Sequence, residues 1–302
     1  MTGVAGVAVA GDTLNTAIYL ARETPRERVT VSYVTLLGAG ALSDQMVRAI
    51  AAEGIDCNLI GRHPDREPGL YLVEHDERGE RSFRYWRSES AARRLFSDGA
   101  PSLDALSGCD LVYLSGITLA ILPPERRAAL IEACAALRKT GCVIAFDSNL
   151  RPRLWESSAA ARKATDAMWR VTDVGFPSLE DIRALHGDLT AEQTLTQIAD
   201  MAVQEIVLRD GARGTTIRRA GKPDIHFRPT PVVVVDSTAA GDAYNAAYLA
   251  TRLRSGTDIE AMRTAQHLAE RVLSFPGAIL TPTVAQQSAR SQHDLGIDGE
   301  RI

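Results

Sequence analysis

Apolar and polar positions along the chain repeat with two different periods, and segments of the two kinds alternate. Short runs of apolar, mostly β-branched residues predict strands at 29–36, 110–117, 142–149 and 205–209. Apolar residues at helical spacing predict helices at 12–22, 42–53, 125–140, 157–172, 180–186, 192–204, 242–254 and 258–274. Strands that alternate with helices are typical of a mostly parallel central sheet with helices on its faces. The pattern therefore predicts an α/β fold.

Two segments interrupt this alternation and predict β-hairpins. The first joins 69–75 to 80–87 through a polar turn, and a shorter one spans 214–227. Tyr85 and Arg87 are two residues apart, so they lie on the same face of their strand. An edge hairpin with solvated charges would show the same pattern, and the residues alone do not decide its role.

The segment VVVVDSTAAGD, at 232–242, combines three features that suit phosphate binding. Its β-branched run predicts a buried strand at 232–235, and an alanine-rich helix follows. The small residues between them leave backbone N–H groups accessible beside the positive end of that helix, which attracts anions. Asp242 opens the helix, and an acid there can take a proton from a hydroxyl that attacks the phosphate. An acid that merely caps the helix is the ordinary alternative, and the segment is not a P-loop, because no Lys follows the glycine.

Composition excludes several classes of protein. The 302 residues are 45% apolar and 24% charged, with a net charge of −4, so there is no electrostatic case for nucleic-acid binding. No run approaches the roughly 20 apolar residues of a membrane span, and the first residues lack the charged start of a secretory signal. The four cysteines form no CxxC pair and no metal-binding spacing with the six histidines. Cys109 and Cys142 precede strand-like runs, and we expect them to be buried thiols in a reducing cytosol.

Four segments resemble the ribokinase-like (PfkB) carbohydrate kinases, and most closely their 2-keto-3-deoxygluconate kinase branch. They are GDTLNTAIYLAR at 11–22, PGLYLVEHDERGERSFRYWRSESAA at 68–92, DLVYLSGITLAIL at 110–122 with FDSNLRPRLW at 146–155, and DSTAAGDAYNAAYLA at 236–250. They occur in the family's order, and the resemblance extends over nearly the whole chain, from Gly11 to about Pro282. The resemblance implies a ribokinase-like core at 1–54 and 88–302, and a small β-sheet lid over the sugar at 55–87.

The resemblance also implies the reaction: ATP-dependent phosphorylation of a keto acid at its C6 hydroxyl, with Mg²⁺ accompanying ATP. Asp242 would be the general base, and the amides of Ala239, Ala240 and Gly241 would stabilise the transferred phosphoryl group. The implied sugar contacts are Gly11, Asp12, Asn15, Tyr71, Tyr85, Arg87 and Arg151, and the implied nucleotide contacts are Asn149, Arg209, Gly211, Ser237 and Gly241. Two forked guanidinium groups suit a carboxylate, which favours a sugar acid over a neutral sugar. A homo-oligomer through the lid sheet is a further expectation.

Each of these residues also has an ordinary interpretation. Asp12 is a plausible helix cap, Arg151 a plausible surface residue, and Arg209 a plausible end of a strand before a turn. The chain also departs from the family in three places. Ala239 replaces the commoner glycine, no Asn-x-x-Glu metal motif is evident near Ser178, and GDTLN follows only ten residues. The last departure predicts either an upstream start or a missing sheet strand. A kinase for fructose or a similar neutral sugar, and a catalytically weak sugar- or nucleotide-binding relative, remain alternatives.

Overall fold

The computed structural model describes residues 8–75, 81–97 and 99–281, and its main feature is a six-stranded sheet. The strand order is β10-β9-β8-β7-β6-β5. Strands β5 to β8 are parallel to one another, and β9 is antiparallel to both of its neighbours, β8 and β10. Their bounds are β5 Leu111–Ser115, β6 Val143–Asp147, β7 Val174–Phe176, β8 Glu205–Arg209, β9 Thr215–Arg219 and β10 Ile225–Phe227. The predicted strands at 110–117, 142–149 and 205–209 and the hairpin at 214–227 are confirmed.

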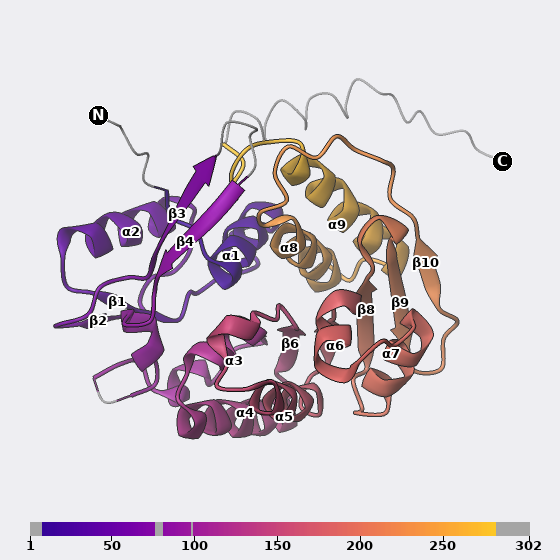
Figure 1. Ribbon diagram of the computed structural model, residues 1–302, viewed down its shortest axis with the longest axis horizontal. Helices are drawn as coiled ribbons and strands as arrows, with labels where there is room; N and C mark the ends of the chain where they lie inside the picture. Colours follow the sequence, from indigo (N-terminus) through magenta and orange to yellow (C-terminus); the bar gives the residue numbers. More distant parts are fainter. Residues whose placement is uncertain (1–7, 76–80, 98, 282–302) are drawn as a thin grey trace.

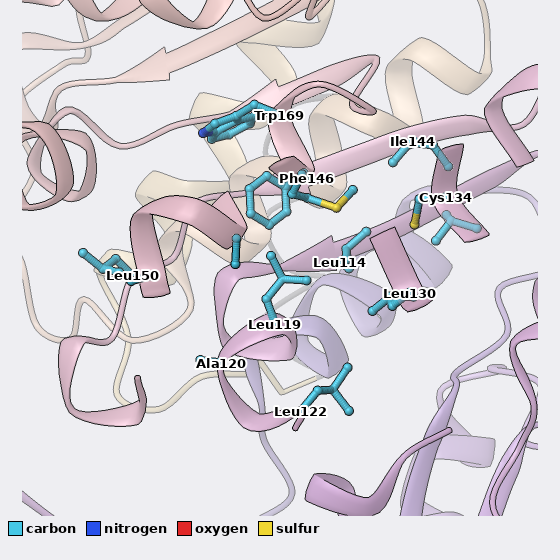
Figure 2. Packing of buried hydrophobic residues seen from close by; sticks show 14 of the residues in the cluster. Leu114, Leu119, Ala120, Leu122, Leu130, Cys134, Ile144, Phe146, Leu150 and Trp169 are labelled. Atoms are coloured by element: carbon cyan, nitrogen blue, oxygen red, sulfur yellow. The ribbon is translucent and has the colours of Figure 1, made fainter. Parts of the chain in front are cut away.

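Helices cover both faces of this sheet (Figure 1). One face packs against α3 Gly116–Ile121, α4 Pro124–Lys139, α5 Ser158–Trp169, α6 Leu179–His186 and α7 Ala191–Ala199. The other packs against α1 Asp12–Glu23, α8 Ala240–Leu253 and α9 Asp258–Leu273. Side chains alternate between the faces along each strand, so Ile144 and Phe146 enter the first layer while Ala145 enters the second. In the first layer, Phe146 meets the edge of Trp169 at 4.6 Å between ring centroids (Figure 2).

Two smaller sheets lie beside the main one. The strands β1 Thr35–Gly38 and β2 Ile60–His63 form a parallel pair next to α2 Ala41–Ala52. The strands β3 Leu70–His75 and β4 Arg81–Trp86 form the predicted antiparallel hairpin (Figure 1). The predicted turn at 76–79 lies outside the described residues. So do the first seven of the ten residues before GDTLN, where the chain is predicted to depart from the family. Within the described part, every helix is too short or too polar to span a lipid bilayer.

Two predicted strands are wrong in part or whole. The strand predicted at 29–36 begins only at Thr35, and the residues before it form a single bridge, between Ser32 and Asp56. The run at 232–235 is not a strand, and Val233 is 84% exposed. Among the described residues, the backbone of this run forms one hydrogen bond, from the N–H of Val235 to the carbonyl of Leu273 at 2.7 Å. A β-branched run forms a strand only where another strand is available to pair with it, and here the neighbour is the end of helix α9.

Candidate active site

A cavity of about 1150 Å³ lies where strand ends, helix starts and the β3–β4 hairpin converge. The main sheet contributes the ends of β6 and β8, and the starts of α1 and α8 line the cavity beside them. The predicted site residues on its lining are Gly11, Asp12, Asn15, Tyr71, Tyr85, Arg87, Asn149, Arg151, Arg209, Gly211, Ser237, Ala239, Gly241 and Asp242. Only Ala240 is missing from the lining, because it lies half-buried against the α1–α8–α9 layer. The fold therefore gathers residues from five distant segments at one place.

The N-terminus of α8 forms one end of the cavity. Ala239 precedes the helix with φ 64° and ψ 5°, a left-handed conformation, and no side chain caps the first turn. Within the described residues, the N–H groups of Gly241 and Asp242 donate no hydrogen bond to protein. Asp236 anchors the loop, since its carboxylate accepts from the N–H of Thr238 at 2.9 Å and of Gly277 at 2.7 Å. Accessible amides at a helix N-terminus form an anion-binding site.

The Asp242 carboxylate lies beside these amides, and the residue as a whole is 9% exposed. It accepts a hydrogen bond from Asn15 Nδ2 at 2.8 Å, which joins α8 to α1. Burial raises the pKa of Asp242 well above its ordinary value, and the nearby carboxylates of Asp12 and Asp147 act in the same direction. The hydrogen bond from Asn15 and the charge of Arg209 partly oppose that rise in pKa. A carboxylate in such a site is a stronger base than one in water.

Asp12 is held at the start of α1 by Ser115 at the end of β5 and by Asn149 in the loop after β6. Its Oδ2 accepts from the hydroxyl of Ser115 and from Asn149 Nδ2, the latter at 3.1 Å. Burial raises the pKa of Asp12, and the hydrogen bond from Ser115 opposes the rise. Asn149 has φ 27°, an uncommon backbone conformation for a residue other than glycine. The side chain of Asn149 points to Asp12, whereas the resemblance implied that it contacts the nucleotide.

A second buried network was missed by the sequence analysis. Asp147, 2% exposed, accepts from Arg209 Nη2 at 2.6 Å and from Asn245 Nδ2 at 2.7 Å. Asn245 lies three residues after Asp242 on α8, and its Nδ2 also donates to the Tyr113 hydroxyl at 3.0 Å. The i, i+3 spacing places Asn245 and Asp242 on neighbouring positions of the helix surface. That spacing, and the position of Asp147 at a strand end, were visible signals for this network.

The β3–β4 hairpin and Arg151 form the other end of the cavity. Tyr71 and Tyr85 are paired across the two strands, with ring centroids 6.1 Å apart. The Arg87 guanidinium lies 4.3 Å from the centroid of the Tyr85 ring. Arg151 Nη1 donates to the carbonyl of Leu150 at 2.8 Å. Neither arginine forms a salt bridge with a carboxylate of the described residues, so both charges are available to an anion.

The third side of the cavity is polar and lies beyond the end of β8. Gly211 and Ser237, the predicted nucleotide contacts, are on the cavity lining, as are Glu180 and Asp181, for which the sequence predicted no role. Asp181 accepts from the Ser148 hydroxyl at 2.7 Å, and burial raises its pKa. In the described part of the chain, no group of three or more His, Cys, Asp or Glu side chains is arranged to hold a metal ion.

Known proteins resemble this chain in sequence and in fold. A family model described as pfkB family carbohydrate kinase matches residues 5–284. The 2-dehydro-3-deoxygluconokinase of Escherichia coli (strain K12) is 38% identical over 275 residues, which cover 89% of each chain. The protein of the same name from Haemophilus influenzae is 36% identical over 89% of this chain and 87% of its own. A structure described as Ribokinase II of E. coli in complex with ATP and Mg²⁺ has a TM-score of 0.82, at 21% identity, covering 97% of this chain and 92% of that one.

Proposed function

The chain belongs to the pfkB family of carbohydrate kinases, and from this premise we propose that it phosphorylates 2-keto-3-deoxygluconate at the C6 hydroxyl, with ATP as the donor. The resemblance inferred from its motifs is thereby confirmed, as is the ribokinase-like α/β fold. The enzyme is an ATP-dependent carbohydrate kinase. The names of its relatives and the charge of its cavity support the identity of the sugar.

The observation that carries the substrate proposal is the pair of arginines at the hairpin end of the cavity. Partial burial lowers the pKa of Arg87, and the charge of Arg151 adds to that shift. Two neighbouring cations without a carboxylate partner among the described residues suit a bound anion. Forked guanidinium groups bind a carboxylate through paired, charge-assisted hydrogen bonds. A sugar acid would place its carboxylate here and extend its carbon chain past Tyr71 and Tyr85 toward Asp242.

Asp242 and the loop before it perform the transfer in this proposal. The C6 hydroxyl oxygen bonds to the γ-phosphorus of ATP as its proton passes to the Asp242 carboxylate, and ADP leaves. Gly11, Asp12 and Asn15 orient the hydroxyls of the sugar. The backbone amides of the segment 239–242 stabilise the negative charge that develops on the transferred group. Such electrostatic stabilisation usually contributes more to the rate than any other effect in phosphoryl transfer.

ATP would occupy the polar side of the cavity, near Arg209, Gly211 and Ser237. Mg²⁺ prefers oxygen ligands and is usually held by substrate phosphates with one or two carboxylates. Glu180 and Asp181 are two carboxylates on the cavity lining, and they would meet the ion directly or through water. The ion supplies charge neutralisation between the phosphates when bound. The need for ATP places the proposed reaction in the cytoplasm.

The hairpin would act as a lid over the sugar and as the contact between subunits. The side of the hairpin away from Tyr71 and Tyr85 exposes Leu70, Leu72 and Trp86 at 55%, 39% and 56%. Exposed apolar side chains gathered on one face suit burial against a second surface. We expect a homo-oligomer through this sheet, and sedimentation of a Trp86→Arg variant beside the unmodified protein would test it.

The test of the substrate is an assay of ADP formation across keto acids, aldonic acids and neutral hexoses, repeated with Arg87→Ala and Arg151→Ala. A lost charge-assisted hydrogen bond costs about 1.5–3 kcal/mol. We therefore expect KM for the keto acid to rise by about 10- to 100-fold in each variant, with KM for ATP little changed. Arg162→Ala removes an exposed arginine from α5, outside the cavity, and serves as the matched control.

Three results would count against this proposal. If fructose is a better acceptor than any sugar acid, the enzyme is a neutral-sugar kinase. If KM for the keto acid is unchanged in both variants, the arginines do not hold its carboxylate. If ATP and the sugar raise the melting temperature but no ADP forms, the chain is a binding protein with weak catalysis.

A further inference from the structure

The guanidinium of Arg209 lies at the base of the cavity and is held by hydrogen bonds to other protein groups, unlike a side chain that is free to contact a nucleotide. Its side chain is 19% exposed and reaches from the end of β8 toward α8. Nη2 donates to Asp147 Oδ1 at 2.6 Å and to the carbonyl of Phe176 at 3.2 Å. These bonds fix the plane of the guanidinium group relative to β6 and β7, since its donors have a rigid fork geometry.

The same guanidinium lies against the backbone of Gly241. A Cβ atom at this position would lie 2.4 Å from Arg209 Nη1, well inside van der Waals contact. Gly241 is inside α8 and is not among the residues with positive φ, so its backbone conformation does not require glycine. In a helix, alanine would be favoured over glycine by about 1 kcal/mol. The close approach of Arg209 is therefore one physical reason for glycine at this position.

Asp147 links Arg209 to the catalytic helix by a second route. Its other carboxylate oxygen accepts from Asn245, which is one helical turn after Asp242. Arg209 thus contacts the first turn of α8 at Gly241 and holds, through Asp147, the turn that follows. Both contacts bear on the part of α8 that carries Asp242 and the anion-binding amides.

We propose that Arg209 is a positioning residue: with Asp147 it sets the position of the first turn of α8, and so aligns Asp242 and the loop amides with the phosphoryl group. The proposal rests on the kinase function above and concerns the same site. Displacement of catalytic groups by about 1 Å can cost on the order of 100-fold in rate. We expect Arg209→Gln to lower kcat by about that factor and to change KM for either substrate by less than about threefold.

The charge of Arg209 supplies a readout that misplacement of the helix alone would not give. Three charged groups face Asp242 from different elements, namely Asp12 from α1, Asp147 from β6 and Arg209 from β8. The tyrosines Tyr19, Tyr71 and Tyr113 also lie within electrostatic reach of this carboxyl. Arg209 lowers the pKa of Asp242, so its removal should raise that pKa further. The acid limb of the kcat/KM profile should move to higher pH in Arg209→Gln and stay in place in Arg209→Lys.

The experiment measures kcat, both KM values and the pH profile for the two Arg209 variants, using whichever acceptor the unmodified enzyme phosphorylates. Lysine keeps the charge but loses the fork, so kcat should fall by about tenfold with an unmoved acid limb. Arg218→Gln removes one arginine from the neighbouring strand β9, outside the cavity, as a control. If kcat of Arg209→Gln stays within threefold of the unmodified value, the proposal is wrong. It is also wrong if only KM for ATP rises, because Arg209 is then a nucleotide contact.

A second measurement tests the geometry without any turnover. Gly241→Ala should lower the midpoint of urea unfolding in the unmodified background, because the new methyl group presses on Arg209. In an Arg209→Ala background, the same change should be neutral or stabilising, as helix propensity predicts. Equal effects of Gly241→Ala in both backgrounds would overturn the contact between these residues. This cycle stands even if no acceptor is phosphorylated, a result that would refute the kinase proposal separately.

Discussion

Replacement of Asp242 by asparagine separates the chemistry of the site from its stability. Asparagine has nearly the same shape, and its Oδ1 can still accept the hydrogen bond that Asn15 Nδ2 donates at 2.8 Å. The amide cannot take a proton from the sugar hydroxyl. A positioned general base contributes about 100- to 10,000-fold to rate, which corresponds to about 3–5 kcal/mol. We expect kcat to fall by that factor while ATP and the sugar acid bind as before.

The same substitution should stabilise the fold at neutral pH. Burial raises the pKa of Asp242 in the folded protein, with Asp12 and Asp147 acting in the same direction. In the unfolded chain this carboxyl has its ordinary pKa of about 4. As pH rises from there through the raised value, the folded state retains a proton that the unfolded state releases, so stability falls. An asparagine does not carry this cost.

The assay is thermal unfolding of both proteins between pH 3.5 and 8.5, beside kcat and KM by ADP release. The melting temperature of Asp242→Asn should exceed that of the unmodified enzyme at pH 8, and the two should converge below about pH 4, the ordinary value. Near-normal turnover in the variant would refute Asp242 as the base. A lower melting temperature at pH 8 would refute the argument from burial.

Three further predictions concern neighbouring residues. Ala239 has a left-handed φ of 64°, which costs an L-residue about 1–2 kcal/mol, so Ala239→Gly should raise the midpoint of urea unfolding. A lower midpoint would show that the loop is unstrained. Asn15→Ala removes a hydrogen bond that lowers the pKa of Asp242, so the acid limb of kcat/KM should shift to higher pH; a shift to lower pH would contradict this. Phe146→Ala leaves a cavity against Trp169 and should lower the free energy of unfolding by about 3–5 kcal/mol, measured by calorimetry or urea unfolding. A loss below about 1 kcal/mol would show that neighbouring side chains fill the cavity.

Local sequence determined most of the elements and the chemistry of their ends. The alternation of strands and helices, the β3–β4 hairpin and the start of α8 near Ala240 all follow from periodicity and turn residues, because these signals act over a few residues. The small residues before Asp242 likewise indicated accessible amides, and they do lie at a bare helix N-terminus. The resemblance to a kinase family indicated which of these ends share a site.

Tertiary structure decided what each of these groups touches. The run at 232–235 has the composition of a strand but no strand beside it, and only the fold shows this. The hydrogen bond between Asn15 and Asp242 joins residues 227 positions apart, and the contact of Arg209 with Gly241 depends on where β8 ends relative to α8. Sequence patterns report the preferences of neighbours along the chain, whereas such contacts are set by how whole layers pack. The sequence by itself therefore determined that a loop of small residues leads into a helix that carries an acid. Packing decided which charges surround this acid and that Arg209 lies against its helix.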